Sequence, residues 1–264
     1  MDQDGRSVGE QTILEGTISV VAALTAGSRP IEVVYLRDDR PTGATQPLAR
    51  LAASRHVRVE RVPVEAIDAR ATGRTHGGVI ALAGPRRLLP LEELAAGTPD
   101  GQADASPDAL AVMLDGVEDP FNFGSAVRSL YAAGVDGLVL RPRNWLSAAG
   151  VVARASAGAS ELMPTAIAET AEDAAAHFRA RGFGIWCATQ GRGSVSLHEA
   201  VPDGPVFLLI GGEKRGVTRS FMDRADILVH VPYGRPGAHS LGTAAAAAVI
   251  AFELLRRRTA RRAE

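Results

Sequence analysis

The chain has 264 residues, a formal net charge of −1, and 46% hydrophobic and 22% charged residues, which is ordinary for a globular protein. One cysteine excludes an internal disulfide and a thiol-rich metal site, and the six histidines show no metal-ligand spacing, so we expect no bound metal. No stretch approaches the roughly 20 apolar residues of a membrane span, and no apolar run marks a signal peptide, so we expect a cytoplasmic protein without a membrane partner.

The first 84 residues alternate helix-like and strand-like apolar spacing. Runs rich in Val and Ile favour strands, while apolar residues three and four apart favour helices. The patterns predict helices at 19–26, 48–53 and 64–71 and strands at 31–36, 57–62 and 78–83. Together they predict a small α/β domain.

Residues 85–108 differ in composition: they contain Pro, Gly, Asp and Ala and show little periodicity beyond a predicted turn of helix at 91–96. Such composition is typical of a linker. We therefore predict a domain over 1–84, a linker over 85–108 and a second domain over 109–264.

The second domain alternates more strongly. Several of its strands are continuously apolar, which predicts a parallel sheet covered by helices on both faces, with ligands at the carboxyl ends of the strands. The predicted strands are 110–114, 137–140, 184–189, 206–210 and 227–231, and the helices are 124–133, 148–155, 171–181 and 241–258.

The balanced charge counts modestly against a large nucleic-acid footprint, because phosphate neutralisation needs an excess of Lys and Arg. Arginines nevertheless cluster at 141 and 143, at 215 and 219, and over 256–262. We interpret the last cluster as a solvated helix end, favourable near the C-terminal dipole.

Three glycine-containing loops follow apolar strands. In the first, over 115–124, Asp119-Pro120 is a turn signal, Asn122 can cap the next helix, and Arg128 lies six residues further on. A capped helix with a surface arginine explains this spacing equally well.

The second loop, 211–216, lets the backbone approach a ligand but matches neither a Walker A loop nor the dinucleotide fingerprint. The third loop, 231–243, leads into an Ala-rich helix that Ser240 or Thr243 could cap. That helix is explained equally well by plain packing. Cys187, within an apolar strand, is interpreted as a small buried residue.

In this order, the loops resemble the three motifs of the SpoU/TrmH methyltransferases. The first motif reads Asp-Pro-x-Asn-x-Gly followed by Arg, here 119–124 with Arg128, and the second reads Gly-x-Glu-x-x-Gly, here 211–216. The third is a Pro-containing strand end and Ser-Leu-Asn, here 231–232 and 240–242. Residues 155–159 resemble the family's Ser-x-Gly-Ala segment, and 14–16 and 75–81 resemble its small L30e-like substrate-recognition domain.

The resemblance implies a C-terminal domain with a parallel sheet and a deep trefoil knot, and a homodimer. It implies S-adenosylmethionine as cofactor and methyl transfer to a ribose 2′-hydroxyl of ribosomal or transfer RNA. The cofactor-binding residues that it implies are Thr189, Gly211, Gly216, Val231 and Leu241.

The resemblance also implies roles at the reacting centre. Arg128, normally completing the partner protomer's site, would act as activator and phosphate clamp because arginine is normally cationic. Asn122 would position it, Glu213 would order the second and third loops through backbone amides, and Ser240 would lie beside the hydroxyl.

One position departs from the family pattern: Gly242 stands where the third motif has Asn. With the balanced charge, this leaves two alternatives open. One is a knotted methyltransferase with a different acceptor, such as a base or a small metabolite. The other is a catalytically inactive relative that binds RNA or cofactor.

Overall fold

The computed structural model describes residues 11–95, 106–142, 148–235 and 240–261. Contacts divide the chain into two compact units. The first joins Met1–Arg87 with Trp145–Leu162, and the second joins Leu88–Asn144 with Met163–Glu264. The linker predicted over 85–108 spans the change from one unit to the next and contains the short helix α4 (Leu91–Ala95). The predicted domain limits stay a prediction.

The first unit is built on a mixed four-stranded sheet in the order β1-β4-β2-β3. Only β2 and β3 run parallel, while β4 pairs antiparallel with both β1 and β2. The strands are β1 (Thr12–Glu15), β2 (Ile31–Arg37), β3 (Arg58–Val62) and β4 (Val79–Ala83), and the helices are α1 (Thr17–Ala26), α2 (Thr42–Ser54) and α3 (Val64–Asp68).

The core of this unit follows the alternation of strand side chains. Val34 and Leu36 of β2 and Val79 and Ala81 of β4 are buried in one cluster with residues of α1 and α2. The sequence predicted each of these seven elements except β1, a four-residue strand too short to show a period of its own.

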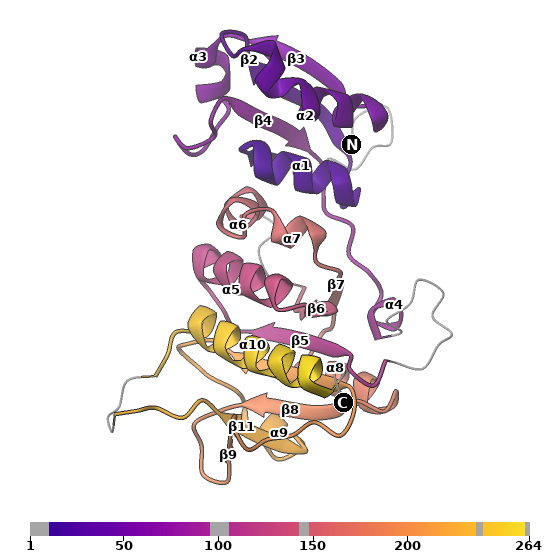
Figure 1. Ribbon diagram of the computed structural model, residues 1–264, viewed down its shortest axis with the longest axis vertical. Coiled ribbons are helices and arrows are strands. Elements are labelled where there is room, and N and C mark those ends of the chain that lie inside the picture. The colour runs from indigo at the N-terminus through magenta and orange to yellow at the C-terminus, as the bar shows by residue number, and fades with distance from the viewer. Residues whose placement is uncertain (1–10, 96–105, 143–147, 236–239, 262–264) are drawn as a thin grey trace. The chain divides into compact units, whose positions relative to one another are not determined.

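Two helices from the middle of the chain, α6 (Ala149–Ala155) and α7 (Ala159–Leu162), belong to the first unit, where they pack with β1 and α1 (Figure 1). Arg29 and Glu161 form an ion pair with Nη2 to Oε1 at 2.9 Å, and their side chains are 2% and 1% exposed. Arg154 pairs with the buried Glu15. Two charge pairs therefore hold this segment in the unit.

The second unit contains a seven-stranded, fully parallel sheet in the order β7-β6-β5-β10-β8-β11-β9. This confirms the predicted parallel sheet. The two strands that the sequence missed are two and three residues long, too short for a pattern. The strands are β5 (Leu110–Asp115), β6 (Gly137–Leu140), β7 (Thr165–Ile167), β8 (Gly184–Ala188), β9 (Val195–Ser196), β10 (Val206–Gly211) and β11 (Ile227–His230).

Helices cover this sheet on both faces. Alternate strand residues, including Met113, Phe207 and Cys187, are buried with Phe178 of α8 (Ala171–Arg179) and Phe221 of α9 (Arg219–Met222). The other face carries α5 (Pro120–Ala132) and α10 (Thr243–Arg261), which pack together, and α10 lies over β5 in Figure 1. Burial raises the pKa of the Cys187 thiol to about 12, as befits the small core residue predicted.

In the arginine run at the end of α10, Arg256 and Arg261 are exposed, as the predicted solvated helix end requires, whereas Arg257 and Arg258 are only 13% and 11% exposed. Arg256 and Arg257 each donate to Glu253, and Arg258 Nη2 lies 2.8 Å from Asp136. The pairs with Glu253 lie within α10, whereas Arg258 with Asp136, and Arg257 through the Leu197 and His198 carbonyls, fasten the helix to the loops beside it. Among the described residues, no helix is long and apolar enough to cross a membrane.

The order of the strands determines where a ligand can bind. From β5 the chain proceeds to β6 and β7 on one side, whereas β10, β8 and β11 lie on the other. The order therefore reverses between β5 and β10. Ligands of parallel α/β sheets bind outside the carboxyl ends of the strands, at such a reversal. All three predicted loops begin at this edge.

Candidate active site

The first loop is held by a helix cap. Asp119 caps α5, because its carboxylate accepts a hydrogen bond of 2.7 Å from the Asn122 backbone N–H, and Pro120 follows at the first helical position. Aspartate and proline are favoured at these two positions. The helix therefore begins four residues earlier than predicted, and Asn122 lies in its first turn instead of capping it.

The first and second loops are joined through their backbones. Gly212 N–H donates to the Asp115 carbonyl at 2.7 Å, and a Cβ on Gly212 would overlap the Gly116 carbonyl oxygen. Only glycine fits where backbone meets backbone so closely. Arg141, at the end of β6, fixes Asp115 through contacts of 2.9 Å to both carboxylate oxygens.

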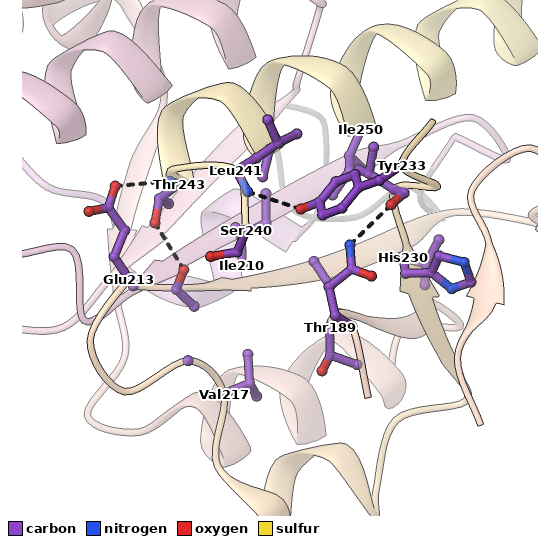
Figure 2. A pocket seen from close by; sticks show the side chains of 18 residues that line it. Thr189, Ile210, Glu213, Val217, His230, Tyr233, Ser240, Leu241, Thr243 and Ile250 are labelled. Carbon is purple, nitrogen blue, oxygen red and sulfur yellow. Dashed lines mark hydrogen bonds between the residues drawn. The ribbon is translucent and has the colours of Figure 1, made fainter. Parts of the chain in front are cut away.

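The second and third loops are joined through Glu213. Its Oε1 accepts from Thr243 N–H at 3.2 Å, and Thr243 Oγ1 donates to the Gly211 carbonyl at 3.2 Å (Figure 2). The predicted cap by Ser240 or Thr243 is thus replaced by a carboxylate from another loop. Negative charge is favourable at this end of α10, where backbone N–H groups lack helical partners.

A cavity of about 260 Å³ lies at the carboxyl ends of β8, β10 and β11. All five residues predicted to bind a cofactor line it, together with Glu213 and Ser240 (Figure 2). Much of its wall is apolar, including Ile210, Val229 and Ile250. Its volume is near the lower end of small-molecule sites, about 300 Å³. We call it the main cavity.

Sequence reasoning missed three polar residues of the main cavity. The Tyr233 hydroxyl accepts from Leu241 N–H at 2.9 Å, and Gln190 Nε2 donates to the Val231 carbonyl at 3.0 Å. The third is His230, whose ring lies 3.0 Å from a serine hydroxyl. Tyr233 and Gln190 each follow an apolar strand in a glycine-containing loop, which was the available signal. No group of metal-binding side chains gathers in the part of the chain that the structure describes.

A second cavity, of about 270 Å³, opens between the first and second loops. It shares Glu213 and Thr243 with the main cavity, and Asn122 lines it. Three of the four predicted catalytic residues therefore line one cavity or the other. Arg128 lines neither and is exposed on α5.

Family models match nearly the whole described chain. The model of the SpoU rRNA methylase family matches residues 109–252, and that of the RNA 2′-O ribose methyltransferase substrate-binding domain matches residues 13–89. The chain belongs to the SpoU rRNA methylase family. This confirms the resemblance carried by the three loops. It makes the chain an S-adenosylmethionine-dependent RNA 2′-O-ribose methyltransferase, and the family implies the trefoil knot, an exception to unknotted folds.

Individual relatives cover almost the whole chain. An uncharacterised tRNA/rRNA methyltransferase of Mycolicibacterium smegmatis is 30% identical over 96% of this chain and 79% of its own. The 23S rRNA (guanosine-2′-O-)-methyltransferase RlmB of Shewanella oneidensis is 27% identical, covering 94% of this chain and 98% of its own. The AdoMet-bound rRNA methyltransferase of Sinorhizobium meliloti superposes with a TM-score of 0.76 at 25% identity, covering 93% and 87% of the two chains.

Proposed function

We propose that this methyltransferase modifies a ribose 2′-hydroxyl of ribosomal or transfer RNA and holds S-adenosylmethionine in the main cavity. The observation that carries the proposal is that the second and third motif loops line that cavity, while the first lines the adjoining second cavity, which shares Glu213 and Thr243 with it. The relatives support the acceptor, since their names specify 23S rRNA or tRNA/rRNA. The free, buried Cys187 fits a reducing cytoplasm, where we place the reaction.

The lining of the main cavity fits the cofactor. An apolar wall suits the adenine ring, and S-adenosylmethionine carries a positive sulfonium. The described lining residues include Glu213, which can carry a negative charge, but no lysine or arginine. Opposite charges attract strongly where water is partly excluded. We assign cofactor contacts to Thr189, Gly211, Gly216, Val231 and Leu241, with much of the binding through the backbone.

The acceptor requires activation as well as positioning. S-adenosylmethionine supplies the methyl group; the oxygen–carbon bond forms as the carbon–sulfur bond breaks, and the hydroxyl proton leaves to solvent. A hydroxyl is a poor nucleophile until its proton is removed or shared, and it must lie in line with the methyl group. We place Ser240 beside that hydroxyl and assign to Asn122 the positioning of Arg128. Glu213 orders the second and third loops.

The exposed position of Arg128 favours a homodimer. Large apolar side chains are exposed on both α5 and α10: Phe121 54%, Tyr131 42%, Val249 41% and Phe252 47%. Exposed apolar groups on adjacent helices are typical of a protein interface. Arg128 lies seven residues after Phe121, on the same side of α5. We propose that a second copy covers this surface, so that Arg128 reaches the partner's cavity and clamps the substrate phosphate.

The division of charge between the two units supports RNA as substrate. The described part of the first unit has twelve arginines and eight carboxylates, a net charge of +4, although the whole chain is at −1. An excess of cations attracts phosphate. The basic surplus thus lies in the unit whose sequence matches the substrate-binding model.

Methyl transfer to RNA tests the proposal. Purified protein is incubated with radiolabelled S-adenosylmethionine and total RNA from a strain lacking it, and the nucleosides are then analysed. Label on a 2′-O-methylnucleoside is the expected result. Cofactor binding without labelled RNA would direct the search to a base or a small metabolite, and cofactor binding with no acceptor would indicate the inactive relative.

Arg128→Ala tests the role of that arginine. Turnover should fall at least 100-fold, because a group that acts on the reacting hydroxyl is removed, while cofactor binding is retained. Arg219→Ala is the matched control, since Arg219 is also exposed in the second unit but lines neither cavity. Equal activity of the two variants would remove Arg128 from the mechanism. Mixing Arg128→Ala with Ser240→Ala protein should restore activity only in a dimer that shares its sites.

A further inference from the structure

The second cavity has an uneven charge that the roles assigned so far do not explain. Its lining includes three carboxylates, those of Glu118, Asp119 and Glu213, but one cation, Lys214. Two of the carboxylates have structural partners, since Asp119 caps α5 and Glu213 bonds the start of α10. Without a cation, this cavity would repel any phosphate beside the main cavity.

Lys214 is held across this cavity by Glu118. Its Nζ donates to the Glu118 carboxylate, which ties the second loop to the first. Lys214 is the single lysine of the chain, and no other lysine or arginine is among the described residues that line either cavity. The hydrogen bond from Lys214 lowers the pKa of the Glu118 carboxyl, so this group is anionic near neutral pH.

The pair is well placed for exchange. The side chains are 76% and 58% exposed, and ion pairs so well solvated contribute little to stability. A phosphate that took the place of the Glu118 carboxylate would therefore break an interaction of little energy. The three nearby carboxylates would repel the negative charge of that phosphate. Lys214 is therefore the side chain that allows a phosphate to bind in the second cavity.

We propose that Lys214 binds a backbone phosphate of the acceptor nucleotide in the second cavity, and that Glu118 holds the lysine in place until RNA displaces it. The inference rests on the proposed RNA substrate. The phosphate exchanges partners with the Glu118 carboxylate, and no covalent bond changes. The adjoining main cavity lies on the other side of Glu213 and Thr243, which line both.

Two substitutions in the full-length protein should have opposite effects. Lys214→Gln should raise the KM for RNA about tenfold with kcat nearly unchanged, and should reduce the slope of log affinity against log salt by about one. Glu118→Gln should tighten RNA binding about threefold, because the competing carboxylate is gone. Affinity for S-adenosylmethionine should change in neither variant.

Arg219→Gln is the matched control, because Arg219 also belongs to an exposed ion pair, with Asp223, and lines neither cavity. The inference is overturned if Lys214→Gln behaves like Arg219→Gln, or if both cavity variants shift RNA affinity in the same direction. In that case the wild-type protein would still methylate RNA. A wild-type protein that neither binds nor methylates RNA would overturn the proposed function, and this inference with it.

Discussion

Breaking the ion pair between Arg29 and Glu161 should unfold the first unit far more easily. Glu161 accepts from Arg29 Nε and Nη2, both at 2.9 Å, and from Ser28 Oγ at 2.6 Å. Because both side chains are almost fully buried, removing one partner leaves a charge without water to solvate it. Such losses cost about 3–5 kcal/mol.

The two single substitutions should differ, because a third charge lies nearby. Arg86 is half-buried, desolvation of its guanidinium lowers its pKa to about 10, and the negative charge of Glu161 acts against that shift. After Arg29→Met, the charge of Arg86 still partly offsets that of Glu161. We therefore expect the free energy of unfolding to fall by about 3 kcal/mol. Glu161→Gln leaves the buried Arg29 and the half-buried Arg86 without this carboxylate, so we expect the free energy of unfolding to fall by about 5 kcal/mol. The double variant Arg29→Met/Glu161→Met should recover more than half of the stability that Glu161→Gln loses.

Hydrogen exchange in increasing urea measures this unit separately from the other, which a single unfolding curve for a two-unit chain does not. Peptides over 11–37 and 148–162 should lose protection together, because the pair joins them. Peptides from β5 and β10 serve as internal controls and should not change. A cost below about 1 kcal/mol for Glu161→Gln would show that water reaches this pair, and would refute the reasoning.

Two further results follow from the second unit. The pKa of Glu253 is lowered to about 2, chiefly by its hydrogen bond with Arg256, so its stabilisation is present above the ordinary value of 4.5 and is lost as pH falls toward 2. Glu253→Gln should therefore lower the free energy of unfolding by about 1 kcal/mol at pH 7 and by nothing near pH 2, measured by hydrogen exchange of α10 peptides in increasing urea; equal losses at both pH values would contradict this. At Gly242, a Cβ would lie 2.9 Å from Glu213 Oε1. Gly242→Asn, which restores the family residue, should displace that carboxylate and lower kcat/KM about tenfold. Gly242→Ala is the control that adds only the Cβ. A gain in activity for Gly242→Asn would show that the missing side-chain amide limits the activity of this chain.

Local patterns in the sequence determined much of the fold and of the candidate site. The strands β5, β8 and β10 are apolar over consecutive residues because both faces of a parallel sheet are covered, so their sequence alone marks them. Loops that follow such strands meet at one edge, which is why the three motifs predicted a common site. The five cofactor residues came from the resemblance, and the structure brings them together in one cavity.

Other features depended on contacts between distant parts of the chain. Only the tertiary structure showed that Glu213 takes the cap expected of Ser240 or Thr243, and that Lys214 meets Glu118, 96 positions away. It also placed α6 and α7 in the first unit, through a pair separated by 132 positions. The physical reason is that apolar periodicity records which side of a strand or helix is buried. A charged side chain looks the same in sequence whether it faces water or a partner, and packing alone decides which.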